Sequence, residues 1–373
     1  MGRQTVVVGM SGGVDSSVTA LLLKQQGYDV IGLFMKNWEE TDQFGKCRSS
    51  YDFQDVEQIC HHLDIPYYTV NFVEEYKNLV FSSFIKDLEQ GYTPNPDILC
   101  NREIKFNVFL KKALSLGADF LATGHYCQKA LNEHGEYQLL KGFDGNKDQS
   151  YFLYTINSQI LEKVLFPIGH LLKPDLRRIA EQHQLITFNK KDSTGICFIG
   201  ERNFKQFLNG YLPYTPGNFE TLEGEILGQH DGVAYYTIGQ RKGMGIGGAG
   251  EPWFVVGKDV KRNVVFLSQG VTHPALYADT LRANELFWVS KQGLPSLPFQ
   301  CKAKIRYRQE DQDCTIEAEK EGVINVRFHK PQRAITSRQA IVFYHENVCL
   351  GGGTILAPGP SYYEQKREMA LSK

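Results

Sequence analysis

The segment that most restricts the fold of this chain is an apolar run, residues 5–10, followed at once by a loop of glycines and hydroxyl side chains, residues 11–17. An apolar helical run, residues 18–23, comes directly after the loop. Glycines let successive backbone N–H groups point into one concavity, and the N-terminus of a helix adds its positive dipole end. A strand, a loop and a helix in this order predict a phosphate-binding site. The chain has no Gly-Lys-Ser or Gly-Lys-Thr, so γ-phosphate transfer by a Walker-type loop is disfavoured.

Strand-like and helix-like segments alternate along the first part of the chain. The continuous apolar run of residues 5–8 is typical of a strand that is buried on both faces, hence of a parallel sheet covered by helices. We therefore expect an α/β fold with a doubly wound parallel sheet. The expected strands are 5–10, 29–35, 67–72 and 119–123, and the expected helices are 16–26, 52–63 and 104–116.

Later segments predict two further domains. A hairpin is expected at 129–142, and helical segments at 149–155 and 175–183. Beyond Pro216 the chain reads as short strands divided by turn signals, and after residue 272 alternating segments indicate a compact β-barrel. The expected domains are the doubly wound domain at 1–200, a small central β-containing domain at 201–272 and a C-terminal β-barrel at 273–373.

Composition narrows the possible partners and sites. The 41 Lys and Arg residues balance 42 Asp and Glu residues, so a nucleic-acid site must come from local patches. No apolar stretch approaches the roughly 18 residues of a membrane span, and no signal peptide or lipidation start is visible, so we expect a cytoplasmic protein without a membrane partner. No two of the eight cysteines have the C-x-x-C spacing, and the adjacent Cys60, His61 and His62 diverge on a helix, so no metal site is expected from these patterns. An iron–sulfur cluster that uses Cys100 and Cys197 stays open as an alternative, although no third cysteine stands out as a ligand.

Two cysteines lie in segments that bring a thiol out of a core. Cys100 follows two prolines, and we expect it directly before a helix, where the helix N-terminus and Arg102 favour the thiolate form. Cys197 lies in a loop between glycines. Each alone is more often structural than catalytic. Beside a phosphate loop, the pair suits a reaction in which one thiol carries sulfur and the other resolves the intermediate, with Asp97 as a candidate general acid or base.

A cationic strand is expected in the barrel. Residues 302–308 alternate Lys or Arg with apolar residues, so an extended strand places four cations on one face. Such a stripe tracks phosphates, and Arg333 and Arg338 extend it. The alternative is an ordinary solvated face of the barrel.

The loop after the first strand resembles the pyrophosphatase loop of the N-type ATP pyrophosphatases, which split ATP to AMP and pyrophosphate by adenylylating a substrate. The resemblance implies that the loop holds the phosphates of ATP with Mg²⁺, which Asp15 helps to orient unless it only caps the helix. It also implies that Met35 and Gly124 contact the nucleoside from strand ends, where open α/β sheets bind ligands. The loop residues concerned are Gly9, Met10, Ser11, Gly12, Gly13, Val14, Asp15 and Ser16.

Several segments in order make nearly the whole chain similar to one family, the tRNA-specific 2-thiouridylases. The similarity implies that ATP adenylylates O2 of the wobble uridine 34 in the tRNAs for lysine, glutamate and glutamine. A persulfide on Cys197 then supplies sulfur to C2, and Cys100 is the nucleophile that either frees hydrosulfide or closes a Cys100–Cys197 disulfide after direct transfer. The segments are 9–17, 94–102, 122–126, 147–150, 192–199 and 239–243.

The same resemblance assigns contacts with the RNA. Asn95, Pro96 and Asp97 lie at the target base. The other implied tRNA contacts are His125, Lys147, Asp148, Gln149, Arg306, Tyr307 and Gln339. The chain departs from the family pattern at one of them, because Ser337 and Arg338 stand where Pro-Gly is expected before the glutamine.

The implied partners are tRNA and a cysteine desulfurase or sulfur-relay protein that donates persulfide, and a monomer is expected. One alternative is a pyrophosphatase-loop ligase of the GMP-synthetase type that acts on a small metabolite. A ligase needs neither the two loop cysteines nor a cationic barrel strand. The other alternative is a non-catalytic RNA-binding protein, for which replacing Cys100 or Cys197 by serine leaves cellular 2-thiouridine unchanged.

Overall fold

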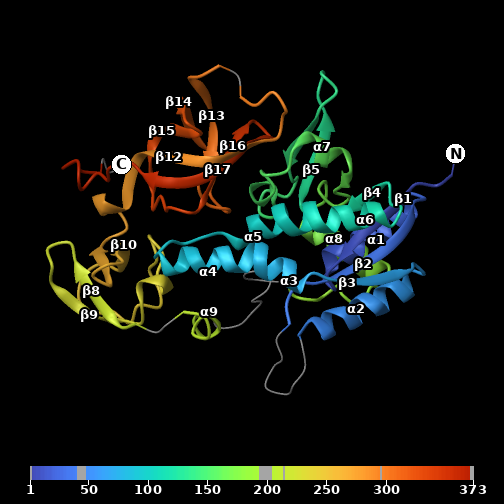
Figure 1. Ribbon diagram of the computed structural model, residues 1–373, viewed down its shortest axis with the longest axis horizontal. Coiled ribbons are helices and arrows are strands. Elements are labelled where there is room, and N and C mark those ends of the chain that lie inside the picture. Colours follow the sequence, from blue (N-terminus) through green and yellow to red (C-terminus); the bar gives the residue numbers. More distant parts are fainter. Residues whose placement is uncertain (1, 40–47, 193–203, 213–214, 295, 370–373) are drawn as a thin grey trace.

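The computed structural model describes residues 2–39, 48–192, 204–212, 215–294 and 296–369. Three regions follow one another along the chain: a parallel sheet covered by helices, a small central sheet, and a β-barrel (Figure 1). Among the described helices, none is long and apolar enough to cross a membrane.

The parallel sheet has the strand order β3-β2-β1-β4-β7, so the first strand lies in its middle. All four neighbouring pairs run parallel, and the carboxyl ends of the strands therefore meet at one edge. The chain moves to one side of β1 with β2 and β3, then to the other with β4 and β7. This reversal confirms the predicted doubly wound sheet and marks the place where such sheets bind ligands. The strands are β1 (Thr5–Met10), β2 (Asp29–Lys36), β3 (Tyr67–Asn71), β4 (Phe120–Ala122) and β7 (Val164–Leu165).

Helices cover both faces of this sheet because successive residues of β1 point to opposite sides. Val6 and Val8 pack with α1, α2 and α8 in one core, whereas Val7 packs with the helical segments 73–89 and 96–115 in another. The helices of the first face are α1 (Val14–Gln25), α2 (Arg48–His62) and α8 (Lys173–Gln182). Those of the second face are α3 (Val73–Tyr76), η1 (Lys77–Phe81), α4 (Ser82–Glu89), α5 (Pro96–Leu99), η2 (Cys100–Phe109) and α6 (Leu110–Ser115).

The helix expected from residue 104 begins earlier than predicted. A continuous helical segment runs from Pro96 to Ser115, and its middle part, η2, is π-helical. Pro96 opens it because a proline in the first turn has no N–H to leave unpaired. Cys100 therefore lies one turn inside the helix and not before it, which corrects the prediction. The other expected helical segment, 149–155, forms only the short 3-10 turn η3 (Ser150–Phe152).

The central region is a four-stranded sheet with the order β10-β11-β8-β9 and its own small apolar core. Its strands are β8 (Gly217–Thr221), β9 (Ile226–His230), β10 (Trp253–Asp259) and β11 (Val264–Gln269). The remaining short helices in the described part of the chain are α7 (Ser158–Glu162), α9 (Phe204–Leu208), η4 (Val233–Tyr235) and η5 (Pro274–Leu276).

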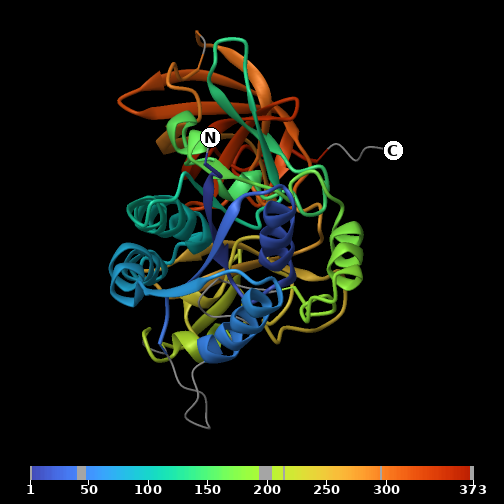
Figure 2. The ribbon, with the colours of Figure 1, turned by 90° about the vertical axis from the view of Figure 1, so that its right-hand side faces the viewer.

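The last six strands close into a barrel, because β12 pairs with both β15 and β17. The predicted hairpin, β5 (Cys127–Leu131) and β6 (Tyr137–Lys141), joins this sheet through β17 and stands against the barrel in Figure 2. The barrel strands are β12 (Tyr277–Trp288), β13 (Phe299–Lys304), β14 (Gln312–Lys320), β15 (Val323–Arg333), β16 (Ala340–His345) and β17 (Val348–Pro358).

The predicted cationic strand at 302–308 is wrong. Strand β13 ends at Lys304, and the chain turns over residues 305–308. Lys304 is buried and lies 3.6 Å from a carboxylate oxygen of Asp148, while Arg306 donates hydrogen bonds to Ala334 and Thr336. Internal carboxylates and carbonyls therefore engage two of the four cations.

Candidate active site

The loop between β1 and α1 has a backbone that only glycine accommodates at its centre. Gly12 has a φ of +71°, and a Cβ atom there would lie 2.6 Å from the carbonyl oxygen of Asp52. Gly124, two residues after β4, is equally constrained, since its Cβ would lie 2.9 Å from the carbonyl carbon of Asp15. The loop after β4 therefore touches the start of α1 across the sheet edge, as expected for two segments that enclose one ligand.

The N–H groups of Val14, Asp15 and Ser16 open helix α1, where no preceding helical carbonyl is in reach of them. Amides in this position bind anions. The hydroxyl oxygens of Ser11 and Ser16 lie 3.2 Å apart beside them. Ser17, by contrast, is fully buried, and its hydroxyl donates to the Gly13 carbonyl at 2.8 Å. Its hydroxyl therefore holds the loop in shape and does not donate to a ligand.

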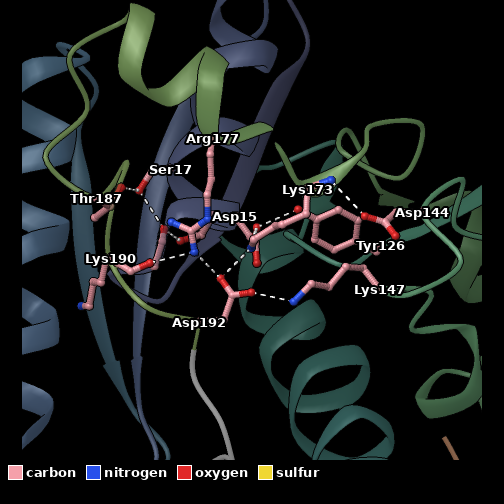
Figure 3. A network of polar contacts seen from close by, with 12 residues as sticks. Asp15, Ser17, Tyr126, Asp144, Lys147, Lys173, Arg177, Thr187, Lys190 and Asp192 are labelled. Atoms are coloured by element: carbon pink, nitrogen blue, oxygen red, sulfur yellow. Dashed lines mark hydrogen bonds and ion pairs between the residues drawn. The ribbon is translucent and has the colours of Figure 1, made fainter. Parts of the chain in front are cut away.

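Asp15 is the centre of a network of polar contacts that joins three segments (Figure 3). Its Oδ1 lies 2.6 Å from the ammonium of Lys173 and accepts a hydrogen bond from the Tyr126 hydroxyl at 3.0 Å. The same ammonium lies 2.9 Å from Oδ1 of Asp192. Arg177 also contacts this Oδ1, and Lys147 contacts Oδ2, both at 2.7 Å. Oδ2 of Asp15 accepts no hydrogen bond from the described residues.

The carboxylate of Asp192 is held in its charged form. Burial opposes the charge, but hydrogen bonds from Lys147 and Lys173 outweigh it and lower the pKa of Asp192 to about 2. Asp192 thus keeps three cations together beside the phosphate loop at neutral pH.

A second lysine ties the loop to α2. The ammonium of Lys190 lies 2.9 Å from the Gly12 carbonyl oxygen, 3.0 Å from Asp52 and 2.6 Å from Asp55. Burial lowers the pKa of Lys190. The hydrogen bonds to Asp55 and Asp52 raise it by more, so the pKa lies above its ordinary value. Lys190 turns the Gly12 carbonyl toward α2, away from the amides at the start of α1.

Sequence reasoning missed Lys173, Lys190 and Asp192 as site residues. Lys173 lies 158 positions from Asp15 in the chain, and no local motif links the two. The one signal available was the first-turn proline at 174, which places the start of a helix directly after Leu172. The proline does not show at which edge of the sheet the helix begins, because that depends on the strand order.

The predicted nucleoside contacts lie at the carboxyl edge of the sheet. Met35 is half-buried near the end of β2, next to β1, and Gly124 follows β4 on the other side of β1. Gly124 lies against the start of α1, and Met35 lies at the same edge of the sheet.

The predicted catalytic segment lies at the start of the continuous helical segment that runs from Pro96 to Ser115. Asn95 is the N-cap residue of α5, Pro96 is buried, and Asp97 lies in the first turn. Cys100 is only 1% exposed, and the guanidinium of Arg102 binds the carboxylate of Glu103 at 2.6 Å. Cys197 lies outside the described residues, so the structure does not test the predicted pair of thiols.

His125 is buried directly after Gly124. One ring nitrogen lies 2.8 Å from the Thr123 hydroxyl and the other 3.5 Å from the Lys105 ammonium. Burial and the Lys105 charge hold the pKa of His125 well below its ordinary value, so the ring is neutral. In this conformation its polar atoms face protein groups.

The other predicted RNA contacts in this region also use polar atoms internally. Lys147 binds Asp192, Asp148 accepts hydrogen bonds from two backbone amides, and Gln149 accepts one from Tyr126. Tyr307 donates to the Lys147 carbonyl at 3.4 Å. Arg306 and these residues therefore stabilise the junction between the first region and the barrel.

Gln339 connects the barrel to the predicted catalytic segment. Its side-chain amide donates to the carbonyl of Thr93, two residues before Asn95, and the Thr93 hydroxyl donates to Thr237 of the central region. Arg338 has a φ of +67°, a conformation that glycine adopts without strain, and it binds Asp87 at 3.3 Å. All three regions meet at Thr93.

Comparisons with known proteins agree along the whole chain. Residues 4–201 match the family model of the tRNA methyl transferase HUP domain, 205–269 a tRNA methyl transferase PRC-barrel domain, and 278–355 an aminomethyltransferase beta-barrel domain. The chain is 62% identical over 367 residues to a tRNA-specific 2-thiouridylase of Protochlamydia amoebophila, covering 98% of this chain and 97% of the relative. The protein of the same name from Halalkalibacterium halodurans is 57% identical, covering 94% of each chain.

Solved structures are more distant. A U34-tRNA thiolase from Methanococcus maripaludis is 18% identical and covers 53% of this chain and 63% of its own, with a TM-score of 0.35. A similarity of this size supports no argument about the site.

Proposed function

Because the chain belongs to the tRNA-specific 2-thiouridylases, we propose that it uses ATP to activate a tRNA uridine and replaces the O2 of that uridine by sulfur. The observation that carries the proposal is the phosphate cradle at the sheet edge, within a chain that is 62% identical to such an enzyme along 98% of its length. A small-metabolite ligase is not favoured, because the relatives named 2-thiouridylases match all three regions.

ATP binds with its phosphates on the amides at the start of α1, in the loop from Gly9 to Ser16. The ammonium of Lys173 supplies the cation that a Walker lysine supplies elsewhere, and Asp15 and Asp192 hold it in place. Asp15 is the residue that would hold Mg²⁺ here, and the ion would offset phosphate charge.

The target uridine enters beside Asn95, Pro96 and Asp97 after leaving the stack of the anticodon loop. Its O2 attacks the α-phosphate of ATP, pyrophosphate leaves, and the O2 becomes part of an AMP leaving group. Neutral His125 and Gln149 support the binding site from within the protein, while Lys147 and Asp148 hold the neighbouring loop in place.

A persulfide on Cys197 supplies the sulfur by one of two routes. Either Cys100 attacks its inner sulfur, which closes a Cys100–Cys197 disulfide and frees hydrosulfide to displace AMP from C2, or its outer sulfur displaces AMP from C2 directly. In the second route Cys100 then attacks the Cys197 sulfur, which closes the same disulfide and releases the 2-thiouridine. Since Cys100 is 1% exposed in the structure, we infer that the first turn of α5 opens for this step.

The substrates are the tRNAs for lysine, glutamate and glutamine, modified at position 34, and a cysteine desulfurase or sulfur-relay protein donates the persulfide. The protein acts as a monomer in the cytoplasm. Its domains are 1–200, 201–272 and 273–373, a division supported by the limits of the three family matches. Tyr307, Arg306 and Gln339 act at the barrel side of the bound tRNA.

The proposal is tested with purified protein, ATP, an unmodified tRNA transcript and sulfide or a persulfide-loaded desulfurase. We expect AMP and 2-thiouridine to form only with tRNA present. Cys100→Ser, assayed with the desulfurase, should still form AMP but little 2-thiouridine, because adenylylation needs no thiol. Exchange of pyrophosphate into ATP at full rate without tRNA would instead identify a small-molecule ligase.

A further inference from the structure

Phe143 has the most exposed side chain among the large apolar residues that the structure describes, at 65%. Single exposed apolar residues are common on protein surfaces and need no function. The position of Phe143 is what distinguishes it, because it lies in a rigid loop beside the candidate active site.

Hydrogen bonds hold the loop of residues 142–150 without help from the Phe143 ring. Oδ1 of Asp148 accepts from the amides of Gly142 and Ser150 at 3.0 and 3.1 Å, and the Asp144 carbonyl accepts from the amides of Lys147 and Asp148 at 2.9 and 2.8 Å. The backbone therefore fixes the point from which the Phe143 side chain leaves the loop, so a partner need not order the loop on binding.

Two further bonds place the loop at the site. The amide of Phe143 donates to the Gly169 carbonyl at 2.9 Å, and the Asp144 carboxylate accepts from the amide of Lys173 at 3.0 Å. The side chain of Lys173 then reaches Asp15 of the phosphate loop (Figure 3). Asp144, the neighbour of Phe143 in the chain, is thus linked through Lys173 to the phosphate loop.

The residues of this loop that face solvent differ in kind from those that bind protein groups. The resemblance assigns tRNA contact to residues 147–149, yet those side chains bind protein groups. The exposed residues of the loop are Phe143, Gly145 and Asn146. A flat ring with a small and a polar neighbour matches a nucleobase, which offers a π-face and polar edges, better than it matches an apolar protein surface.

We propose that Phe143 is a platform on which an unpaired nucleobase of the bound tRNA stacks. This inference rests on the proposed function, since it needs tRNA at this edge of the sheet. Base–aromatic stacking strengthens binding to single-stranded RNA, and removing the ring is expected to raise the Kd for tRNA roughly 5- to 150-fold.

The test measures the Kd for tRNA transcripts by fluorescence anisotropy, without ATP or sulfur donor. Phe143→Ala and Phe143→Leu should both bind tRNA more weakly, and Phe143→Tyr should bind like the wild type, because only the last keeps a flat ring. Leu116→Ala is the control: this side chain is 45% exposed but follows α6, at the opposite, amino edge of the sheet. Thermal melting checks that each variant folds.

Three outcomes overturn the inference. Equal Kd values for the wild type and Phe143→Ala show that no base stacks there, and weak binding by Phe143→Tyr shows that the flat ring is not the cause. Unchanged tRNA binding with a raised KM for the sulfur donor shows that the ring contacts a protein. Absence of tRNA binding by the wild type would refute the proposed function itself, which separates the two failures.

Discussion

The ammonium of Lys173 lies 2.6 Å from Asp15 and 2.9 Å from Asp192, beside a phosphate loop that has no lysine of its own. Replacing it by methionine removes the charge but keeps the length of the side chain. We expect Lys173→Met to lower the rate of tRNA-dependent AMP formation about 100-fold or more, and Lys173→Arg to retain part of it. Lys163→Met, at an exposed lysine that contacts Glu162, is the control. A rate for Lys173→Met within threefold of the wild type would contradict this role.

Asp192 makes the stability of the folded protein depend on pH, in a direction that follows from its pKa. Its folded-state pKa of about 2 lies below the ordinary value of 3.8, so the unfolded chain binds more protons between these values. The stability that Asp192 contributes is therefore fully present above pH 4 and is lost as the pH falls toward 2. Urea unfolding should show Asp192→Asn less stable than the wild type at pH 6, with the difference shrinking below pH 4. Asp64→Asn, at an exposed side chain, should show no such trend, and a constant difference for Asp192→Asn would refute the assignment.

Individual site residues could be predicted only where a local sequence pattern indicated them. The glycines of the phosphate loop stand together after one strand, so their role follows from neighbouring residues. Lys173 contacts Asp15, and Asp192 contacts Lys173, only through the fold; the first-turn proline at 174 indicates the start of a helix but not these contacts. The burial of Cys100 was also out of reach, because it depends on the helices that pack over it.

At the scale of elements, the loop between β1 and α1 depends on the backbone of Gly12. A Cβ atom at this position would meet the Asp52 carbonyl oxygen at 2.6 Å, in addition to the strain of a positive φ. We expect Gly12→Ala to weaken ATP binding at least tenfold, measured by calorimetry. Gly135→Ala is a matched control, because Gly135 has a φ of +74° but open space around it. If both variants bind ATP like the wild type, the loop tolerates the displacement and the cradle is not the binding site.

The turn before α5 is held by Gln339 of the barrel. Its amide donates to the Thr93 carbonyl, and both residues are at least partly buried, so Gln339→Ala leaves that carbonyl without its partner. We expect a loss of about 1–3 kcal/mol of stability and faster hydrogen exchange at residues 87–93. Gln365→Ala removes a similar but exposed bond to Pro360 and should change neither. Unaltered exchange in Gln339→Ala would show that the barrel does not fix this turn.

Elements with a strong apolar period were predicted well, and elements decided by tertiary contacts were not. Strands β1, β2 and β3 and helix α8 begin and end within a few residues of the prediction, since each carries its own pattern of buried positions. The expected strand at 302–308 also alternates, but Asp148 and the 334–336 segment engage Lys304 and Arg306, and the chain turns after residue 304. Alternation alone did not reveal those partners.

At the scale of the whole molecule, the three regions are joined around the site and not merely linked in series. The hairpin of β5 and β6 extends the barrel sheet, with Leu140 opposite Val348. Thr93 is bound from both other regions, and the Lys258 ammonium of the central sheet donates to the Gly91 carbonyl at 2.9 Å. These contacts join residues more than 140 positions apart, so the fold class followed from the sequence but the assembly of the site did not.

The central claim is that the chain makes 2-thiouridine in tRNA, and cellular tRNA tests it most directly. Digested tRNA from a strain that lacks the gene is compared by mass spectrometry with tRNA from the same strain carrying the wild-type gene or the Cys100→Ser variant. The account predicts that 2-thiouridine is lost in the deletion strain, returns with the wild-type gene, and stays absent with Cys100→Ser. Normal 2-thiouridine levels in the deletion strain, with no second copy of the gene present, would contradict it.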